Sequence, residues 1–400
     1  MRISLEAGNL DNTSVTVGTQ QIVLQNYFYG NFTSLPDVAA PSEWLPNGNL
    51  RMWIPVRGGS VCVEGPDISH LSYKSFALRA GPTGEFDDNY AGLTGSVLRF
   101  PDGKYYAAYH GDNGGTRTGG GVSPNFGGFW QEVGAASSVD GYTFNRIGKI
   151  ISSWEPIGTL VGNGADTNAN GGAQHPSLAF SRDGKYVYCY FLDYTYSIQG
   201  SIGWLTFPWS VARSKVSDLM APGSWFKYYH PYTTQYNTNH PNFCSFSEPG
   251  LQSQPTNWTW FSANYLNVNY PTTLLSNDTG GWIMHSVRYI TNSRVYLSTM
   301  IYSSNAVTGA SSGLFYSLSS NGLEWVPARR ITNSVVFANG FNLLYPTFVE
   351  GLDCSATNIS GWIFYGYTPG MGIGHVGAVF PINISAPGPM ETTPLINPAL

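Results

Sequence analysis

The chain has 400 residues, with 19 Lys and Arg against 24 Asp and Glu, which gives a formal net charge of −5. Charged residues make up 11% of the sequence, whereas an average soluble domain has about 25%. Aromatic residues make up 15%. This aromatic content excludes a disordered chain, and the scarcity of basic residues argues against a nucleic-acid partner. No run of about 18 apolar residues occurs, so we expect no membrane-spanning helix.

The N-terminal segment 1–6 has no apolar stretch long enough to form a signal peptide. Few charges, many tyrosines and a set of Asn-x-Ser/Thr sequences nevertheless favour a secreted glycoprotein. Those sequences begin at Asn12, Asn31, Asn257, Asn277, Asn358 and Asn383. The spacing of the cysteines fits no zinc site, and one or two disulfides stay open; they are Cys62, Cys189, Cys244 and Cys354. We expect Cys189, inside an apolar strand, to be a buried thiol.

Nearly the whole chain has the pattern of short strands and tight turns, and the one predicted helix is a short one at 214–220. The segment 186–191 alternates Tyr186, Tyr188 and Tyr190 with apolar residues, so both faces of this strand are apolar or aromatic. A strand of this kind lies in a sheet that is covered on both sides.

A strand–turn–strand unit recurs along the chain. Its copies contain Val97, Leu178, Leu274 and Phe348 at the same place in the first strand, and segment 281–286 is the predicted second strand of the third copy. These positions are about 80 residues apart, a period that suits four-stranded propeller blades with long loops. Segments 138–144 and 319–325 share a Ser-x-Asp/Asn-Gly-x-x-aromatic turn, whose aromatic residue is predicted to fill the gap between neighbouring sheets.

We therefore predict an all-β fold, a single five-bladed β-propeller over residues 1–385. Segment 50–78 supplies the fifth blade, and segment 15–29 closes the ring against the last one. Residues 386–400 form an extended or disordered tail. A propeller buries both faces of every blade, which accounts for strands without a polar face. The alternatives are a seven-bladed propeller with shorter blades and, third, a β-sandwich.

Several motifs resemble those of the five-bladed propeller glycoside hydrolases, which include arabinanase- and arabinofuranosidase-type enzymes. They are the His/Tyr-Pro-Ser/Thr starts of the inner strands, the Ser-x-Asp-Gly turns, and segments 211–214, 221–229 and 246–250. The resemblance covers residues 90–370 and supports the fold more than the activity. It implies a base, an acid and a modulator carboxylate around a central funnel. This chain departs from the pattern because His175 and Tyr345 stand where an Asp is expected before proline.

Glycosidic hydrolysis needs two carboxyl groups beside one bond, one protonated and one ionised. Asp87 and Asp88 precede an inner strand and are predicted at the mouth of the ring, as base or nucleophile; a solvated turn or a calcium ligand is the alternative. Glu248, in a loop rich in Tyr and Asn, is the preferred general acid, and Glu350 is the other candidate. For both, a structural ion pair or turn position is the alternative.

The histidines suggest a second chemistry. His110 ends a strand with Arg117 nearby, and His175 opens an inner strand. A His or Tyr base, with an Arg that neutralises a uronate, would serve a polysaccharide lyase. Trp258 and Tyr229 lie in predicted loops, where a flat ring can stack on a sugar, whereas Trp225, Trp325 and Trp362 are expected to fill gaps between blades.

We thus expect a secreted, monomeric glycoside hydrolase that acts on a plant, algal or microbial glycan. The runner-up is a polysaccharide lyase, and the third hypothesis is a propeller that binds glycans without cleaving them. No cofactor is expected, although carboxylates and carbonyls in the central channel could bind one structural calcium ion.

Overall fold

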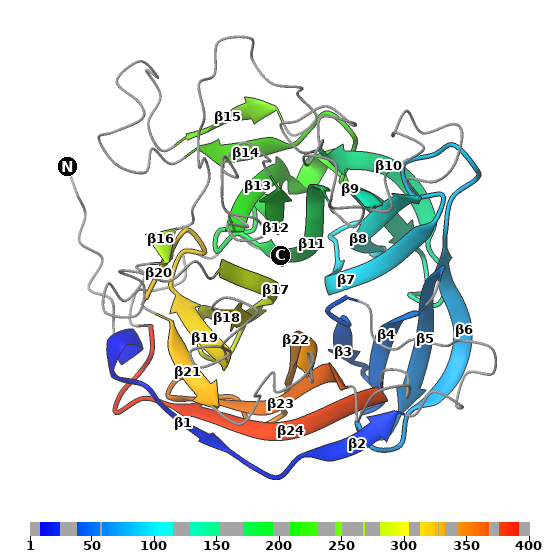
Figure 1. Ribbon diagram of the computed structural model, residues 1–400. Coiled ribbons are helices and arrows are strands. Elements are labelled where there is room, and N and C mark those ends of the chain that lie inside the picture. The colour runs from blue at the N-terminus through cyan, green and yellow to red at the C-terminus, as the bar shows by residue number, and fades with distance from the viewer. Residues whose placement is uncertain are drawn as a thin grey trace.

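A computed structural model describes residues 9–24, 38–56, 58–114, 129–152, 171–194, 209–229, 245–249, 267–268, 281–303, 313–326, 328–332, 343–367 and 376–391. These residues form a ring of five β-sheet blades around a central axis (Figure 1). The predicted five-bladed propeller is therefore confirmed, and the seven-bladed ring is not what the protein forms. Among the described residues, no helix is long and apolar enough to cross a membrane.

Each blade begins with its innermost strand and continues outward. The first blade consists of β3 (Ser42–Trp44), β4 (Leu50–Val56), β5 (Gly59–Gly65) and β6 (Ser72–Arg79). The second consists of β7 (Tyr90–Arg99), β8 (Tyr105–Gly114), β9 (Phe129–Ser138) and β10 (Asn145–Ile151). The third consists of β11 (Gly171–Phe180), β12 (Tyr186–Tyr194), β13 (Trp209–Lys215), β14 (Phe226–Tyr229) and β15 (Ser245–Pro249).

The fourth blade consists of β17 (Gly281–Ile290), β18 (Val295–Ser303), β19 (Gly313–Ser319) and β21 (Arg329–Thr332). A small parallel pair, β16 (Asn267–Val268) and β20 (Glu324–Trp325), lies apart from it. The fifth blade combines both ends of the described chain: β22 (Leu343–Glu350), β23 (Asn358–Tyr367), β24 (Val376–Ser385), β1 (Ser14–Val17) and β2 (Gln21–Leu24). Both N-terminal strands pair antiparallel with β24, so the predicted ring closure is confirmed for residues 15–24.

Five apolar clusters hold the ring together, one between each pair of adjacent blades. Strand β12 shows why: Tyr188 and Tyr190 pack toward the fourth blade, while Val187, Cys189 and Phe191 pack toward the second. The two-sided burial predicted for this strand is confirmed. Burial raises the pKa of the Cys189 thiol, as expected of an inert side chain in the core. Cys62 and Cys354 are also buried free thiols.

The Ser-x-Asp/Asn-Gly turns latch one blade onto the next. In the second blade, Ser138 Oγ accepts a hydrogen bond from the Gly141 N–H at 2.9 Å, and Gly141 takes the left-handed φ of 79° that this turn requires. The Gly141 carbonyl then accepts the indole N–H of Trp53 in the first blade at 2.7 Å. Phe144 meets the same indole edge-on at 6.1 Å. The predicted role of the aromatic residue is thus confirmed.

Two predicted elements differ from the structure. The helix expected over 214–220 is a single 3-10 turn, η4 (Val216–Asp218), which ends at Leu219 with a left-handed φ of 50°; a second 3-10 turn, η1 (Asn9–Asn12), precedes β1. Segment 281–286 was expected to be the second strand of its blade but belongs to the innermost strand, β17. The first strand predicted there, 271–275, lies outside the described residues.

Candidate functional site

The inner strands share a local irregularity where they line the axis. Register shifts interrupt β7 between Leu93 and Val97, β11 between Gln174 and Ser177, and β22 between Leu344 and Thr347. A bulge of this kind bends the strand and re-aims a side chain, and bulges are common beside active sites. The bulges in β11 and β22 contain the two His/Tyr-Pro pairs of the sequence, His175-Pro176 and Tyr345-Pro346.

His175 and Tyr345 occupy equivalent positions in their blades and share an unusual backbone. Their φ angles are 53° and 55°, in the left-handed region that side chains other than glycine rarely adopt. Such a conformation costs about 1–3 kcal/mol at each residue, and strain of this kind gathers at functional sites. The two rings lie 5.2 Å apart, centroid to centroid, so the two bulges bring His175 and Tyr345 together near the axis.

A hydrogen-bonded chain leads from β8 to the bulge of β11. The Asp112 carboxylate lies 2.5 Å from His110 Nε2, and His110 Nδ1 accepts the backbone N–H of His175 at 3.3 Å. Because Nδ1 accepts, the ring proton resides on Nε2 and is donated to Asp112. That bulged N–H has left the β-sheet ladder, so His110 supplies the acceptor it needs. His110 therefore positions His175, and Asp112 fixes the tautomer of His110.

Further polar groups surround this chain. The Tyr90 and His110 rings meet edge-on at 5.9 Å. Gln131 is in register with Asp112, and Gln174 precedes His175. Within the described part of the protein, Gln131 Oε1 and Gln174 Nε2 are buried without a hydrogen-bond partner. Buried polar atoms of this kind are costly, so they mark the site as one that is suited to a hydrogen-bonding ligand.

Asp87 lies on the other side of β8 from this cluster. Its carboxylate accepts the Tyr109 hydroxyl at 2.9 Å and lies 3.5 Å from the Arg146 guanidinium. Tyr109 belongs to the apolar cluster between the first and second blades, whereas the neighbouring His110 faces the third blade. Burial raises the pKa of the Asp87 carboxyl, although the Tyr109 hydroxyl and Arg146 act in the opposite direction. The sequence pattern predicted Asp87 at the mouth of the ring; the structure places it between two blades.

Asp87→Asn is expected to change how stability depends on pH. The folded-state pKa of Asp87 is raised, so the contribution of this group to the free energy of unfolding falls as pH rises from its ordinary pKa through the raised one. Asparagine cannot titrate, so the variant should gain stability relative to the parent protein across that window and stay ahead above it. Denaturant unfolding at a series of pH values measures this. Asp87→Ala should instead lose about 1–3 kcal/mol, because it orphans the Tyr109 hydroxyl.

Asp88 lies nearer to the cluster. Its carboxylate accepts the Gly84 N–H at 2.9 Å, and the next residue, Asn89, donates its N–H to the Asp112 carbonyl at 3.0 Å. Glu350 lies at the opposite end of β22 from Tyr345, about 16 Å away along the strand. There it forms an ion pair with Arg288 at 3.1 Å. The structure thus brings together His110 and His175, with Asp88 adjacent, and separates Asp87 and Glu350 from them.

The remaining predicted residues lie farther out or outside the described ranges. Glu248 belongs to β15, the outermost strand of the third blade, in register with Lys227 of β14. Four strand spacings of about 4.8 Å separate β15 from the inner strand β11. Tyr229 ends β14 in the same outer region. Arg117 and Trp258 lie outside the described residues.

Sequence reasoning overlooked Tyr345, Gln131 and Gln174 as site residues. Tyr345 carried a usable signal, since Tyr345-Pro346-Thr347 matches His175-Pro176-Ser177 in residue type and in place within the repeat. The glutamines carried none, because their position depends on strand register. Among the described residues, no three His, Cys, Asp or Glu side chains gather as a cation site, and the calcium ion stays a prediction.

The fold and the histidine cluster together define a five-bladed propeller with a polar site near its axis. No family model and no curated protein matches the sequence. Solved structures match its fold. The complex of BT0996 and RGII is 12% identical, with a TM-score of 0.50, over 94% of this protein and 95% of that one.

Two further solved structures match over similar lengths. A family 117 glycoside hydrolase, Zg3597 from the marine bacterium Zobellia galactanivorans, is 11% identical over 94% of this protein and 91% of that one, with a TM-score of 0.49. A thermostable family-43 glycoside hydrolase is 11% identical over 94% and 99%, with a TM-score of 0.46. At these identities the likeness establishes the fold alone, and the resemblance inferred from the sequence is confirmed at that level.

Proposed function

We propose that the protein is a carbohydrate-active enzyme, a glycoside hydrolase that cleaves a glycan at the end of the hub where His175 and Tyr345 meet. The observation that carries the proposal is the Asp112–His110–His175 chain, which ends at a residue with a strained backbone. The motifs that resemble those of the five-bladed propeller glycoside hydrolases support the same class of reaction.

In this proposal His175 transfers the proton. As an imidazolium it gives a proton to the glycosidic oxygen, so that the bond to the anomeric carbon breaks and the leaving sugar departs as an alcohol. Asp88 takes a proton from the water that attacks the anomeric carbon. His110 and Asp112 hold the His175 backbone, and Tyr345 packs against its ring. Secretion and a monomeric state are part of the proposal, on the composition and sequons of the sequence.

A polysaccharide lyase is the second candidate. It is favoured by the make-up of the cluster, in which two histidines and a tyrosine adjoin a carboxylate that is already bonded to His110. There, His175 would remove the proton beside a uronate carboxylate, and the 4-oxygen would leave to form an unsaturated sugar. Analysis of products separates the two: a hydrolase releases reducing ends alone, whereas a lyase also creates the ultraviolet absorbance of an unsaturated uronate.

The adjacent pair Asp87 and Asp88 provides a matched test of the hydrolase. Asp88→Asn should lower the rate of reducing-end release at least about a hundredfold, as removal of a proton-transfer group does. Asp87→Asn should leave the rate unchanged, because that carboxyl lies on the other face of β8. Equal loss in both variants, or in neither, would contradict the assignment. Glycan binding with no product from the parent protein would favour the non-catalytic alternative.

A further inference from the structure

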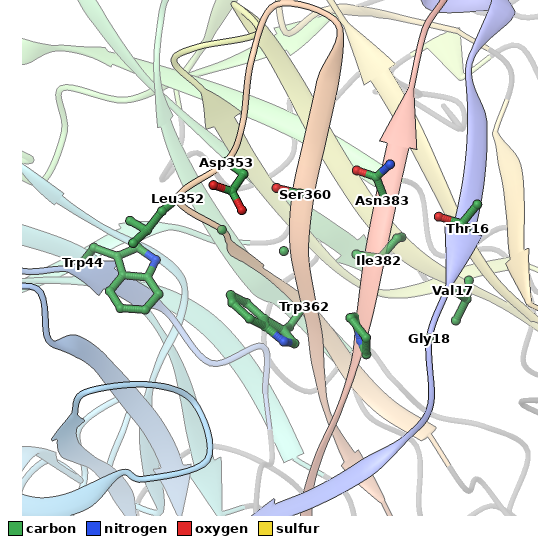
Figure 2. Close-up of a pocket in the computed structure, with 13 residues that line it drawn as sticks. Thr16, Val17, Gly18, Trp44, Leu352, Asp353, Ser360, Trp362, Ile382 and Asn383 are labelled. Carbon is green, nitrogen blue, oxygen red and sulfur yellow. The ribbon is translucent and has the colours of Figure 1, made fainter.

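A pocket of about 630 Å³ lies at the seam between the fifth and first blades (Figure 2). Its floor and one wall come from β1, β23 and β24, and the other wall comes from Trp44 of β3 and the turn after β22. That turn follows Glu350, so the pocket is near the opposite end of β22 from Tyr345. The pocket is therefore distinct from the site near the axis.

The sheet face in this pocket has a polar row beside an aromatic one. Thr16, Asn383 and Ser360 are in register across three neighbouring strands, and Figure 2 shows their side chains in one row. Trp362, two residues along β23 from Ser360, is in register with Pro381. Neighbouring strands lie about 4.8 Å apart and alternate residues about 6.6 Å apart. A row of hydroxyl, amide and hydroxyl groups thus adjoins a flat apolar surface of sugar-ring dimensions.

The second tryptophan is held in place by the scaffold. Trp44 donates its indole N–H to the Glu350 carbonyl at 2.7 Å, and the Glu350 carboxylate is itself fixed by Arg288. Both Trp44 and Trp362 are partly buried against the apolar cluster between these blades. At the rim, Leu352 is 72% exposed. Rigid aromatic walls of this kind cost little entropy when a ligand binds.

The polar groups of the pocket select for a neutral ligand. Asp353 is the one residue with a formal charge among those that line the pocket, all of which the structure describes. A carboxylate accepts hydrogen bonds from sugar hydroxyls but repels a uronate or a sulfated sugar. Within the described part of the protein, Ser360 Oγ is buried without a hydrogen-bond partner, so it has unused capacity for a hydroxyl.

We propose that this pocket binds a neutral pyranose residue of a glycan, in addition to the site near the axis. The apolar C–H face of the sugar ring packs on Trp362, and its hydroxyl edge lies along the polar row. Asp353 accepts from a hydroxyl on the opposite edge. A ring-shaped ligand with one apolar face and polar edges matches this arrangement, whereas an extended peptide would leave the polar row unpaired.

Indole-¹⁵N-labelled protein tests the proposal without reference to catalysis. The protein is titrated separately with the methyl pyranosides of glucose, galactose, mannose and galacturonic acid, and Trp44→Phe and Trp362→Phe assign the two indole signals. We expect at least one neutral glycoside to shift both signals and the galacturonoside to shift neither. Asp353→Ala and Asn383→Ala should each weaken binding about tenfold, in line with the loss of one hydrogen bond to a charged or amide group.

The exposed Asp67 of the first blade provides the matched control, since Asp67→Ala should leave the titration unchanged. Three outcomes would overturn the proposal: no shift with any neutral glycoside, an unchanged affinity in both pocket variants, or equal binding of the galacturonoside. Because no reaction is measured, failure here would leave the proposed cleavage at His175 unaffected, and an inactive His175 variant should still bind the pyranoside.

Discussion

Replacing His175 with alanine is expected to lower the rate of glycan cleavage by about 10²–10⁴-fold, the usual contribution of a proton-transfer group. The side chain lies where the bulges of β11 and β22 converge, with its ring 5.1 Å from His110 and 5.2 Å from Tyr345. Alanine removes the imidazole but keeps the backbone N–H that His110 accepts. Initial rates of reducing-end release, measured on the glycan that the parent protein cleaves, test the effect.

Glycine at the same position separates function from strain. His175→Gly should be as inactive as His175→Ala but more stable than it by about 1 kcal/mol, because glycine adopts the left-handed φ of 53° without a steric penalty. Leu219, with a φ of 50° at the end of η4, is the matched control. Leu219→Gly should gain a similar stability and keep full activity. An active His175→Ala variant would remove His175 from the mechanism.

Trp53→Ala is expected to lower the free energy of unfolding by about 3–5 kcal/mol, the range for a large aromatic residue removed from a core. Trp53 is fully buried between the first and second blades, and its indole N–H holds the carbonyl of the Gly141 turn. The variant loses both the apolar contact with Phe144 and the hydrogen bond that latches the two blades. Denaturant unfolding, followed by far-ultraviolet circular dichroism, measures the loss.

Trp53→Phe distinguishes the two contributions. Phenylalanine keeps most of the packing but orphans the Gly141 carbonyl, which should cost about 1–3 kcal/mol. The half-exposed Tyr73 serves as the control, since Tyr73→Ala should change stability by less than about 0.5 kcal/mol. If Trp53→Ala were no less stable than Tyr73→Ala, the turn would not be the latch between these blades.

The fold could be predicted because burial leaves a local record in the sequence. The alternation of tyrosines with apolar residues in β12 reflects packing on both faces of one strand, and the Ser-x-Asp-Gly turn reflects hydrogen bonds within seven residues. Blade four was misread at its start because segment 281–286 has the same composition as a second strand. Composition indicates that a strand is buried, but not how far from the axis it lies.

The site could be predicted only in part. His110 and His175 were found because each adjoins an inner-strand pattern, but Asp87, Glu248 and Glu350 were chosen for being acidic in a sequence with few acids. Whether a carboxylate faces the axis depends on register and on strand order, which place Asp87 across β8, Glu248 on β15 and Glu350 beside Arg288. Those relations join residues that are far apart in sequence, so no local pattern records them.

The pairing of β1 and β2 with β24 has a consequence for how the protein is made. Val15 and Ile384 are partners across almost the full length of the sequence, so the earliest strands to leave the ribosome wait for the latest one. Until then, the edge of the last blade presents unsatisfied amide groups to other nascent polypeptides, a state that invites aggregation. Assembly of this ring is therefore a post-translational event, and chaperones that shield open β-edges are the cellular factors on which its yield should depend.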